Sequence, residues 1–180
     1  MNLIDLPSAA HDPLEPLFAF HRRLERRLAD LTGLQVRLEV GGIDAEASAA
    51  AAAIVECVAS ACTSHHRAQE HDLLPLIERR IPGEEALAAF RELRARLGHD
   101  HREIERAWHG LRRPLEAIAE GIPRRLRQED IHYFRALCAV HISLEDSSLH
   151  LLALRHLQPR DRHVLGQRIR ERRSRALRAA

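Results

Sequence analysis

The 180-residue sequence is poor in aromatic residues, cysteine, glycine and proline, and it has no lysine at all. Phe, Trp and Tyr make up only 3% of the chain, so a core must be built from Leu, Ala, Ile and Val. This set of residues, with 8 Gly and 8 Pro, favours helices over sheets. The 45% hydrophobic and 30% charged content is typical of a globular chain, long enough for one domain with a core of its own.

Three cysteines with no CxxC spacing argue against a disulfide framework and fit a reducing compartment. The N-terminal stretch MNLIDLPSAAHDPLEP lacks the basic and apolar regions of a signal peptide, so we expect none. The most apolar run, AEASAAAAAIVECVASAC, carries Glu46 and Glu56 and predicts a helix, not a membrane span. We therefore expect a cytoplasmic protein with no membrane contact. Without a Gly-rich phosphate loop or a GxSxG nucleophile, we do not expect an enzyme.

Glycine and proline divide the chain into five predicted helices. Gly33 and then Gly41-Gly42 close the first helix, and Pro82-Gly83 and Gly121 separate the next three. The expected ranges are 13–33, 44–80, 84–120, 123–158 and a shorter helix from 159 onward. The first four are amphipathic, which predicts an all-α four-helix bundle over residues 13–157 with an additional Arg-rich C-terminal helix over residues 160–180.

One histidine interrupts the apolar stripe of each bundle helix. These four are His21, His65, His101 and His141. The stripes of the second and fourth helices match at an offset of 76 (141 minus 65), aligning Cys62 with Cys138 and Gln69 with Glu145. The first and third match at an offset of 80 (101 minus 21), HRRLER beside HREIER. The chain therefore reads as one helical hairpin used twice.

The stretch SHHRAQEHDLLP offers two competing pairs with helical spacing, His65 with Gln69 and His66 with Glu70. On an α-helical wheel centred near Cys62, Gln69 falls roughly 20° and Glu70 roughly 80° from the apolar midline. The duplication favours His65 and Gln69 as the inward pair, with His66 and Glu70 close enough to compete.

A single histidine on an apolar stripe is more often a satisfied core residue than a metal ligand. Four in matching register should converge on the bundle axis, where burial of several imidazoles and carboxylates without a partner would cost several kcal/mol. A cation supplies that partner, and histidine mixed with carboxylate suits iron or manganese better than a structural zinc site. The alternative is a hydrogen-bonded polar core without metal. The other histidines are expected to be exposed: His71, His99, His109, His132, His150, His156 and His163.

The motifs FHRRLER, HHRAQEHDLLPLI, DHREIERAW and HISLED, in this order, resemble the hemerythrin-like, or HHE cation-binding, domain family. The resemblance covers about residues 13 to 157. It implies an up-down bundle around a non-haem di-iron centre, and a role in oxygen, nitric oxide or redox sensing, iron handling or repair of iron centres. Carried over by register, the implied metal ligands are His21, His65, His101, His141 and Glu145.

Gln69 departs from the family pattern, because it stands where a bridging glutamate is usual and a neutral amide bridges two cations poorly. Three outcomes remain open: Glu70 and His66 replace it, the site holds a single iron, or the site is degenerate. Glu25 and Glu105, each one turn after a histidine, could compensate or could be outer ion-pair residues. Asp146 could be a ligand or a surface acid.

The leading hypothesis is an iron-binding bundle whose small partner is a diatomic molecule, oxygen or nitric oxide. The second is a metal-free, degenerate bundle that acts as an interaction or structural protein. The Arg-rich tail, DRHVLGQRIRERRSRALRAA, could contact nucleic acid. We favour instead a solvated amphipathic helix that covers one end of the bundle through Val164, Leu165, Ile169 and Leu177, because no aromatic residues or DNA-binding motif accompany the charge.

Overall fold

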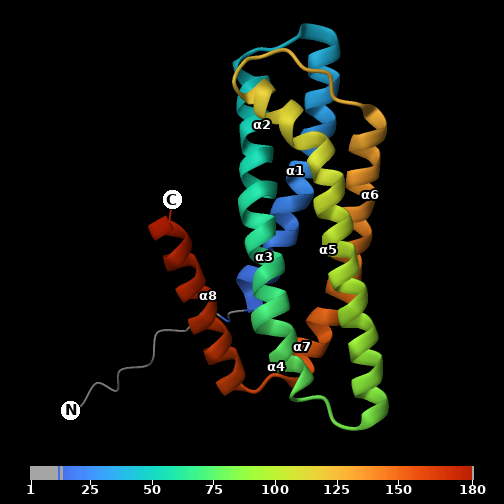
Figure 1. Cartoon of the computed structure of the whole chain (residues 1–180), viewed down its shortest axis with the longest axis vertical. Helices are drawn as coiled ribbons and strands as arrows, with labels where there is room; N and C mark the ends of the chain where they lie inside the picture. The colour runs from blue at the N-terminus through green and yellow to red at the C-terminus, as the bar shows by residue number, and fades with distance from the viewer. Residues whose placement is uncertain (1–11, 13, 180) are drawn as a thin grey trace, which may run out of the picture.

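The computed structural model describes residue 12 and residues 14–179, and all of the regular structure in this part of the chain is helical. The side chains of residues 173 and 175–179 are not described, which leaves Leu177 outside the account. The N-terminal stretch weighed above as a signal peptide, residues 1–11 and 13, also lies outside it. Four long helical columns form an up-down bundle, and a fifth helix lies along its side (Figure 1).

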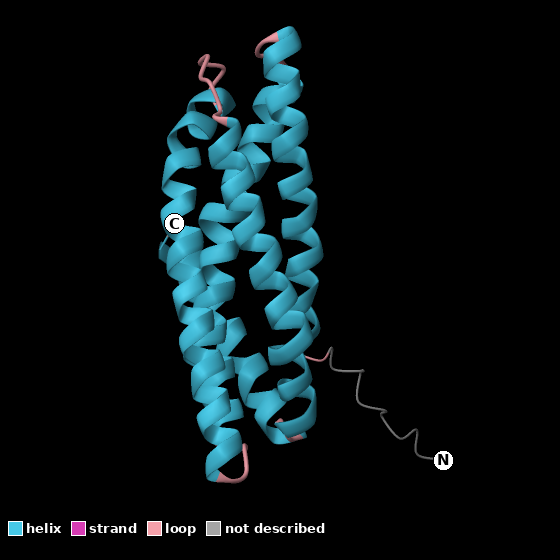
Figure 2. Ribbon diagram, turned by 90° about the vertical axis from the view of Figure 1, so that its right-hand side faces the viewer, coloured by secondary structure: helices cyan, strands magenta, loops and turns pink. Residues whose placement is uncertain are grey.

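The first column is α1 (Leu14–Gly41), and the third is α5 (Glu84–Ala119). The second column is continuous but changes its winding: α2 (Ala45–Glu56), η1 (Cys57–Cys62), α3 (Thr63–Ala68), η2 (Gln69–Leu73) and α4 (Leu74–Glu78), where η marks π-helix. The fourth column is α6 (Gln128–Leu144), η3 (Glu145–Leu149) and α7 (His150–His156). The last helix is α8 (Pro159–Ala179). The columns run side by side in two orthogonal views (Figures 1 and 2).

The predicted end of the first helix at Gly33 is wrong. The helix continues to Gly41 because Leu34 is buried and Leu38 packs against the core beyond Gly33, and this packing outweighs the weak helix propensity of one glycine. The predicted start of the fourth helix near Pro123 is also wrong. Leu126 is buried ahead of Gln128, so the connection is held to the bundle without being helical. Gly121, at φ +76°, ends α5 where predicted.

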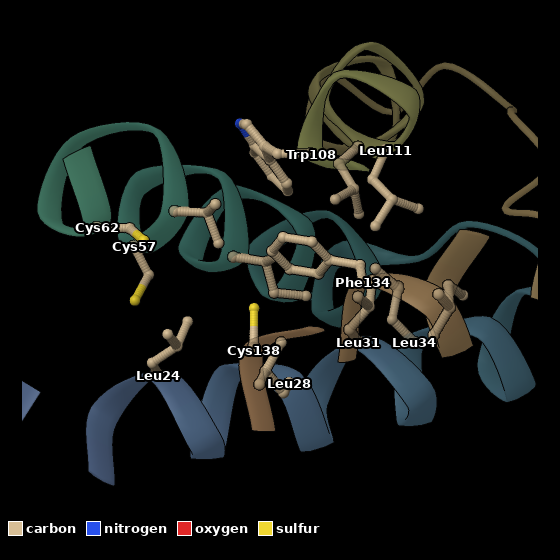
Figure 3. Packing of buried hydrophobic residues seen from close by; sticks show 14 of the residues in the cluster. Leu24, Leu28, Leu31, Leu34, Cys57, Cys62, Trp108, Leu111, Phe134 and Cys138 are labelled. Carbon is tan, nitrogen blue, oxygen red and sulfur yellow. The ribbon is translucent and has the colours of Figure 1, made fainter. Parts of the chain in front are cut away.

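Apolar side chains form two separate cores. The larger core joins the second half of α1 to α2, η1, α6 and the C-terminal half of α5, with Phe134 and Leu111 among its fully buried members (Figure 3). The smaller core joins the start of α1 to α4, α7, α8 and the N-terminal half of α5. Between them lies a polar layer containing His21, His65, His101, His141 and Glu145. The side chains predicted to bind metal therefore share one level of the bundle.

Helix α8 packs against the second column at η2, and Leu165 is buried in the smaller core as expected for an amphipathic helix. Arg80 donates a hydrogen bond to Asp161 at its start, and Arg172 donates to the buried Asp72 of η2 further along. The helix thus lies along the flank of the column that carries His65 and Gln69 (Figure 1).

By length and composition alone, two helical runs are apolar enough to cross a membrane, Ala45–Glu78 and Gln128–His156. They are the second and fourth bundle columns, and the inward sides of both contribute to the polar layer and the two cores.

Candidate metal centre

Four columns each deliver one histidine to the polar layer, and the fourth also delivers a carboxylate. His21 comes from α1, His65 from α3, His101 from α5, and His141 from α6. Glu145 begins η3, one turn after His141, and has no exposed surface. Each histidine is at most 6% exposed. The structure thus brings together the five residues that the family resemblance, carried over by register, implied as ligands.

Glu145 lies at the centre of the cluster, with imidazole nitrogens at both of its oxygens. Its Oε2 is 2.8 Å from His21 Nε2 and 3.3 Å from His65 Nε2. Its Oε1 is 2.8 Å from His141 Nε2 and 3.7 Å from His101 Nε2. One carboxylate therefore joins two pairs of histidines, which is the arrangement of a group that bridges two cations.

Both competing pairs on the second column turn toward this layer, at different depths. Gln69 is fully buried and donates a hydrogen bond from Nε2 to Glu145 Oε2 at 2.5 Å. Glu70 is half-buried and accepts a hydrogen bond from His101 Nδ1 at 2.6 Å. The His66 ring stacks on His101, with centroids 3.8 Å apart and planes 10° apart. The sequence favoured His65 and Gln69 and left His66 and Glu70 as competitors, and the structure has the first pair buried and the second half-buried.

Carboxylates outside the cluster orient the histidines from behind. His21 Nδ1 donates to Asp146 Oδ1 at 2.7 Å, in the same way that His101 donates to Glu70. Asp100 Oδ2 lies 3.9 Å from His141 Nδ1. A histidine that donates one nitrogen to a carboxylate has its other nitrogen fixed toward the metal and made more basic. Asp146 and Glu70 thus serve as outer carboxylates.

The protonation states differ sharply within the layer. Burial would raise the pKa of Glu145, but hydrogen bonds from the surrounding imidazoles hold it well below its usual value. Burial alone would lower the pKa of His21, but Glu145 and Asp146 outweigh it and raise it. Burial dominates at His65, whose pKa is lowered. The metal-free layer therefore holds an ionised carboxylate next to a histidine that retains its proton more strongly than usual.

Several buried polar atoms of the layer have no hydrogen-bond partner among the described residues. Three of them are His101 Nε2, His141 Nε2 and Glu145 Oε1, which make no hydrogen bond of good geometry although Oε1 forms an ion pair with His141 Nε2 at 2.8 Å. His65 Nδ1 and Gln69 Oε1 are also unpartnered. Buried polar groups are normally satisfied, and leaving one unsatisfied costs about 1–3 kcal/mol. Nitrogen and carboxylate donors left open at one place fit a bound cation.

Two groups of potential ligands emerge from these positions. Their ligand atoms lie within 4.8 Å of one another in each group: His21, His65 and Glu145 in the first, and His66, His101 and His141 in the second. Glu145 Oε1 reaches the second group through His141. The layer therefore offers two groups of possible metal ligands, and Glu145 contacts both.

Other candidate residues lie outside the cluster. Glu105 is exposed on α5, and Glu25 is exposed on α1, where it lines a groove of about 780 Å³ together with Arg135, Ser143 and Asp146. Both side chains are exposed although each is only about 40° around its helix from an inward histidine, so neither belongs to the buried cluster. Through the groove, solvent reaches the outer side of Asp146 but not the buried His21.

Most histidines expected at the surface are there: His71, His99, His109, His132 and His163 are exposed. His150 and His156 are half-buried instead. The ring of His150 stacks on Phe18 with centroids 3.8 Å apart, so the expectation of a solvent-exposed side chain is wrong there.

Sequence reasoning missed two acids near the site. Asp100 directly precedes His101, so the DH pair in DHREIER was an available signal. Asp72 is buried and binds Arg172 from α8. Its partner lies 100 residues away in the sequence, and no local pattern could have indicated it.

Of the comparisons with known proteins, one finds no match and one identifies a family whose description agrees with this geometry. No curated protein matches the chain. The family model described as "Hemerythrin HHE cation binding domain" matches residues 12–153, which include the first three bundle columns and the fourth as far as Ala153, and stop before α8. Since that match spans most of the 180 residues, the chain belongs to the hemerythrin HHE cation-binding domain family.

Proposed function

We propose that the protein binds non-haem iron as a pair of ions in the polar layer, and that it serves in oxygen, nitric oxide or redox sensing, in iron handling or in the repair of iron centres. The observation that carries the proposal is Glu145, which has histidine nitrogens at both oxygens while neighbouring buried ligand atoms stay unpartnered. Family membership supports cation binding. Histidine with carboxylate is a donor set that suits iron.

Charge balance supports two divalent ions. Glu145 lies inside the layer, and Asp146, Glu70 and Asp100 lie directly behind His21, His101 and His141. These four carboxylates carry four formal negative charges, partly offset at Asp100 by Arg96, whose Nε lies 3.7 Å away, so they compensate most of the charge of two ferrous ions. Burial of cations without such compensation would cost far more than the site can return.

The residues themselves would divide the work. His21, His65 and Glu145 would hold one ion, and His101, His141 and Glu145 the other, with Asp146 and Glu70 fixing the ring orientations. Bound iron would supply an open coordination position for a diatomic ligand. The two apolar cores on either side of the layer would exclude water from it.

We further propose that the protein is cytoplasmic, since its three cysteines are buried and unpaired within the described chain. Contact with a membrane or with nucleic acid is not part of this proposal.

The test is the iron content per chain after anaerobic loading, for wild type and His141→Ala. We expect about two irons in the wild type and a clear loss in the variant, because His141 contacts the bridging carboxylate directly. The exposed His132, two turns earlier on the same helix, gives the control His132→Ala, which should bind iron like the wild type. No iron in any of the three proteins would end the proposal.

A second candidate function is an interaction or structural protein that binds no metal. The hydrogen bond from Gln69 to Glu145 favours it, because it satisfies one carboxylate oxygen without a cation. Near-ultraviolet absorption after iron addition in air separates the two candidates. The iron-binding protein gains a charge-transfer band, and a metal-free bundle does not.

A further inference from the structure

The two halves of the polar layer are not equally provided with ligands. Around Glu145 Oε2 lie His21, His65 and the Gln69 amide, whereas Oε1 faces only His101 and His141. Gln69 cannot act as a second bridge while its NH₂ group donates to Glu145. An ion on the Oε1 side would therefore have three ligands from these residues, two imidazole nitrogens and one shared carboxylate oxygen. A glutamate at position 69 would have supplied a fourth.

His66 is placed to fill this gap. A nitrogen of its ring lies within 4.8 Å of nitrogens of His101 and His141. The ring stacks on His101 and meets His141 edge-on with centroids 5.5 Å apart. His66 therefore belongs to the Oε1 side of the layer, whereas its neighbour His65 belongs to the Oε2 side.

The second column differs from the fourth in its winding just ahead of His66. The π-helix η1 (Cys57–Cys62) ends three residues before His65, and η2 begins at Gln69. At the offset of 76, η2 matches η3 of the fourth column residue for residue, but the stretch equivalent to η1 is regular helix within α6. The position equivalent to His66 is Ile142, a buried core residue. The extra π-helix and the extra histidine thus occur together, in one hairpin only, and π-helical turns are frequent at functional sites.

We propose that His66 is a ligand of the second cation, together with His101, His141 and Glu145. This assignment rests on the iron-binding function proposed above. In this assignment the imidazole of His66, which would bind one ion only, takes the place of a bridging carboxylate at position 69. The two ions would then share one protein carboxylate, Glu145, and have different sets of ligands. Glu70 is then a positioning residue, since its carboxylate is already engaged by His101 Nδ1.

Binding requires the His66 ring to leave its stack. The lone pair of an imidazole nitrogen lies in the ring plane, and two parallel rings 3.8 Å apart cannot both direct lone pairs at one ion. Turning the ring gives up that stack and the contact between its Nε2 and Cys62 Sγ at 3.5 Å. Both are weak interactions beside a bond to a metal ion.

The experiment compares wild type, His66→Ala and the control His71→Ala, which removes an exposed histidine five residues further along the same column. Each protein is loaded anaerobically with ferrous iron and desalted, and iron per chain is measured, with circular dichroism to verify the fold. We expect two irons in wild type and control and one in His66→Ala, with the affinity for the second ion lowered at least about 100-fold. Mössbauer spectra should contain two distinct ferrous sites in the wild type and one in the variant.

A second variant separates ligation from a structural effect. If His66 supplies the ligand that position 69 does not, a carboxylate there should restore the second ion, so His66→Ala combined with Gln69→Glu should again hold two irons. Two irons in His66→Ala alone would overturn the assignment, as would an equal loss of both ions or failure of the double variant. Wild-type protein that binds one iron, unchanged in His66→Ala, would also overturn it while leaving iron binding intact. Wild-type protein without iron would instead end the proposed function itself.

Discussion

The proton on His21 should compete with iron. Burial would lower the pKa of His21, but Glu145 and Asp146 raise it. The imidazole of His21 therefore stays protonated above the pH at which an ordinary histidine loses its proton. A cation must displace that proton, because metals bind neutral imidazole. The apparent iron affinity should therefore rise with pH through the raised pKa of His21 and then level off. Calorimetric titration in two buffers of different protonation enthalpy measures the protons released.

The exposed His99 provides the control, since His99→Ala should release as many protons as the wild type. An affinity that does not change with pH would contradict this account of His21.

The carboxyl group of Glu145 affects the stability of the fold at acidic pH. Its lowered pKa stabilises the metal-free fold above the ordinary carboxyl pKa, and this stabilisation is lost as the pH falls through the lowered value.

Gln69→Glu should have opposite effects on the metal-free and iron-loaded proteins. Without metal, the change replaces an amide donor 2.5 Å from Glu145 by a second carboxylate in a buried layer. Losing the bond and burying a like charge should lower the free energy of unfolding by about 1–3 kcal/mol. With iron, the new carboxylate offers a second bridge, so the melting temperature should rise further on iron addition than in the wild type. Thermal melts with and without ferrous iron test both parts.

Gln167→Glu, at an exposed position on α8, controls for the added charge and should change neither melt appreciably. A metal-free Gln69→Glu protein as stable as the wild type would mean that the Gln69–Glu145 hydrogen bond contributes nothing.

At the scale of the helical element, α8 should stabilise the column that carries His65 and Gln69. Arg172 donates to Asp72 Oδ2 from Nη2 at 2.8 Å and from Nε at 3.2 Å, and Asp72 is 5% exposed. Arg172→Gln leaves this carboxylate buried without its charged partner, at a cost of about 1–3 kcal/mol. Urea unfolding should place the variant below both the wild type and Arg168→Gln, a change on the same helix. Equal effects of the two substitutions would show that the ion pair does not fasten α8.

The helical elements also explain how far the sequence could predict the site. Each amphipathic stripe has α-helical spacing over most of its length, so the bundle and the register of the four histidines could be read directly. The π-helices could not be predicted from this spacing. A wheel at a constant angle forces a choice between Gln69 and Glu70, whereas η2 begins at Gln69 and the structure engages both. The outer carboxylate role of Asp146 was equally hidden, since its partner His21 lies 125 residues away.

At the scale of the whole molecule, the two cores should respond to substitution to similar degrees. Phe134 in the larger core has no exposed surface, and Leu74 in the smaller core is 1% exposed. Truncating a large buried side chain to alanine typically costs about 2–5 kcal/mol, through lost burial and the cavity that remains. Phe134→Ala and Leu74→Ala should each lose that much in chemical denaturation. The exposed Tyr133 and Leu151 give the matched controls Tyr133→Ala and Leu151→Ala, which should lose less than about 1 kcal/mol.

The polar layer between the two cores has a consequence for folding cooperativity. Apolar contact couples the residues within each core, but across the layer the columns of metal-free protein are joined by polar contacts around Glu145, and several polar atoms there have no hydrogen bond among the described residues. We therefore expect the metal-free bundle to unfold as two partly independent units, and ions bound to residues from all four columns would join them into one. Calorimetry should therefore give a van't Hoff enthalpy below the calorimetric enthalpy without iron, and the two should converge once iron is bound. The same ions that would bind a diatomic ligand would thus make the bundle unfold as a single unit.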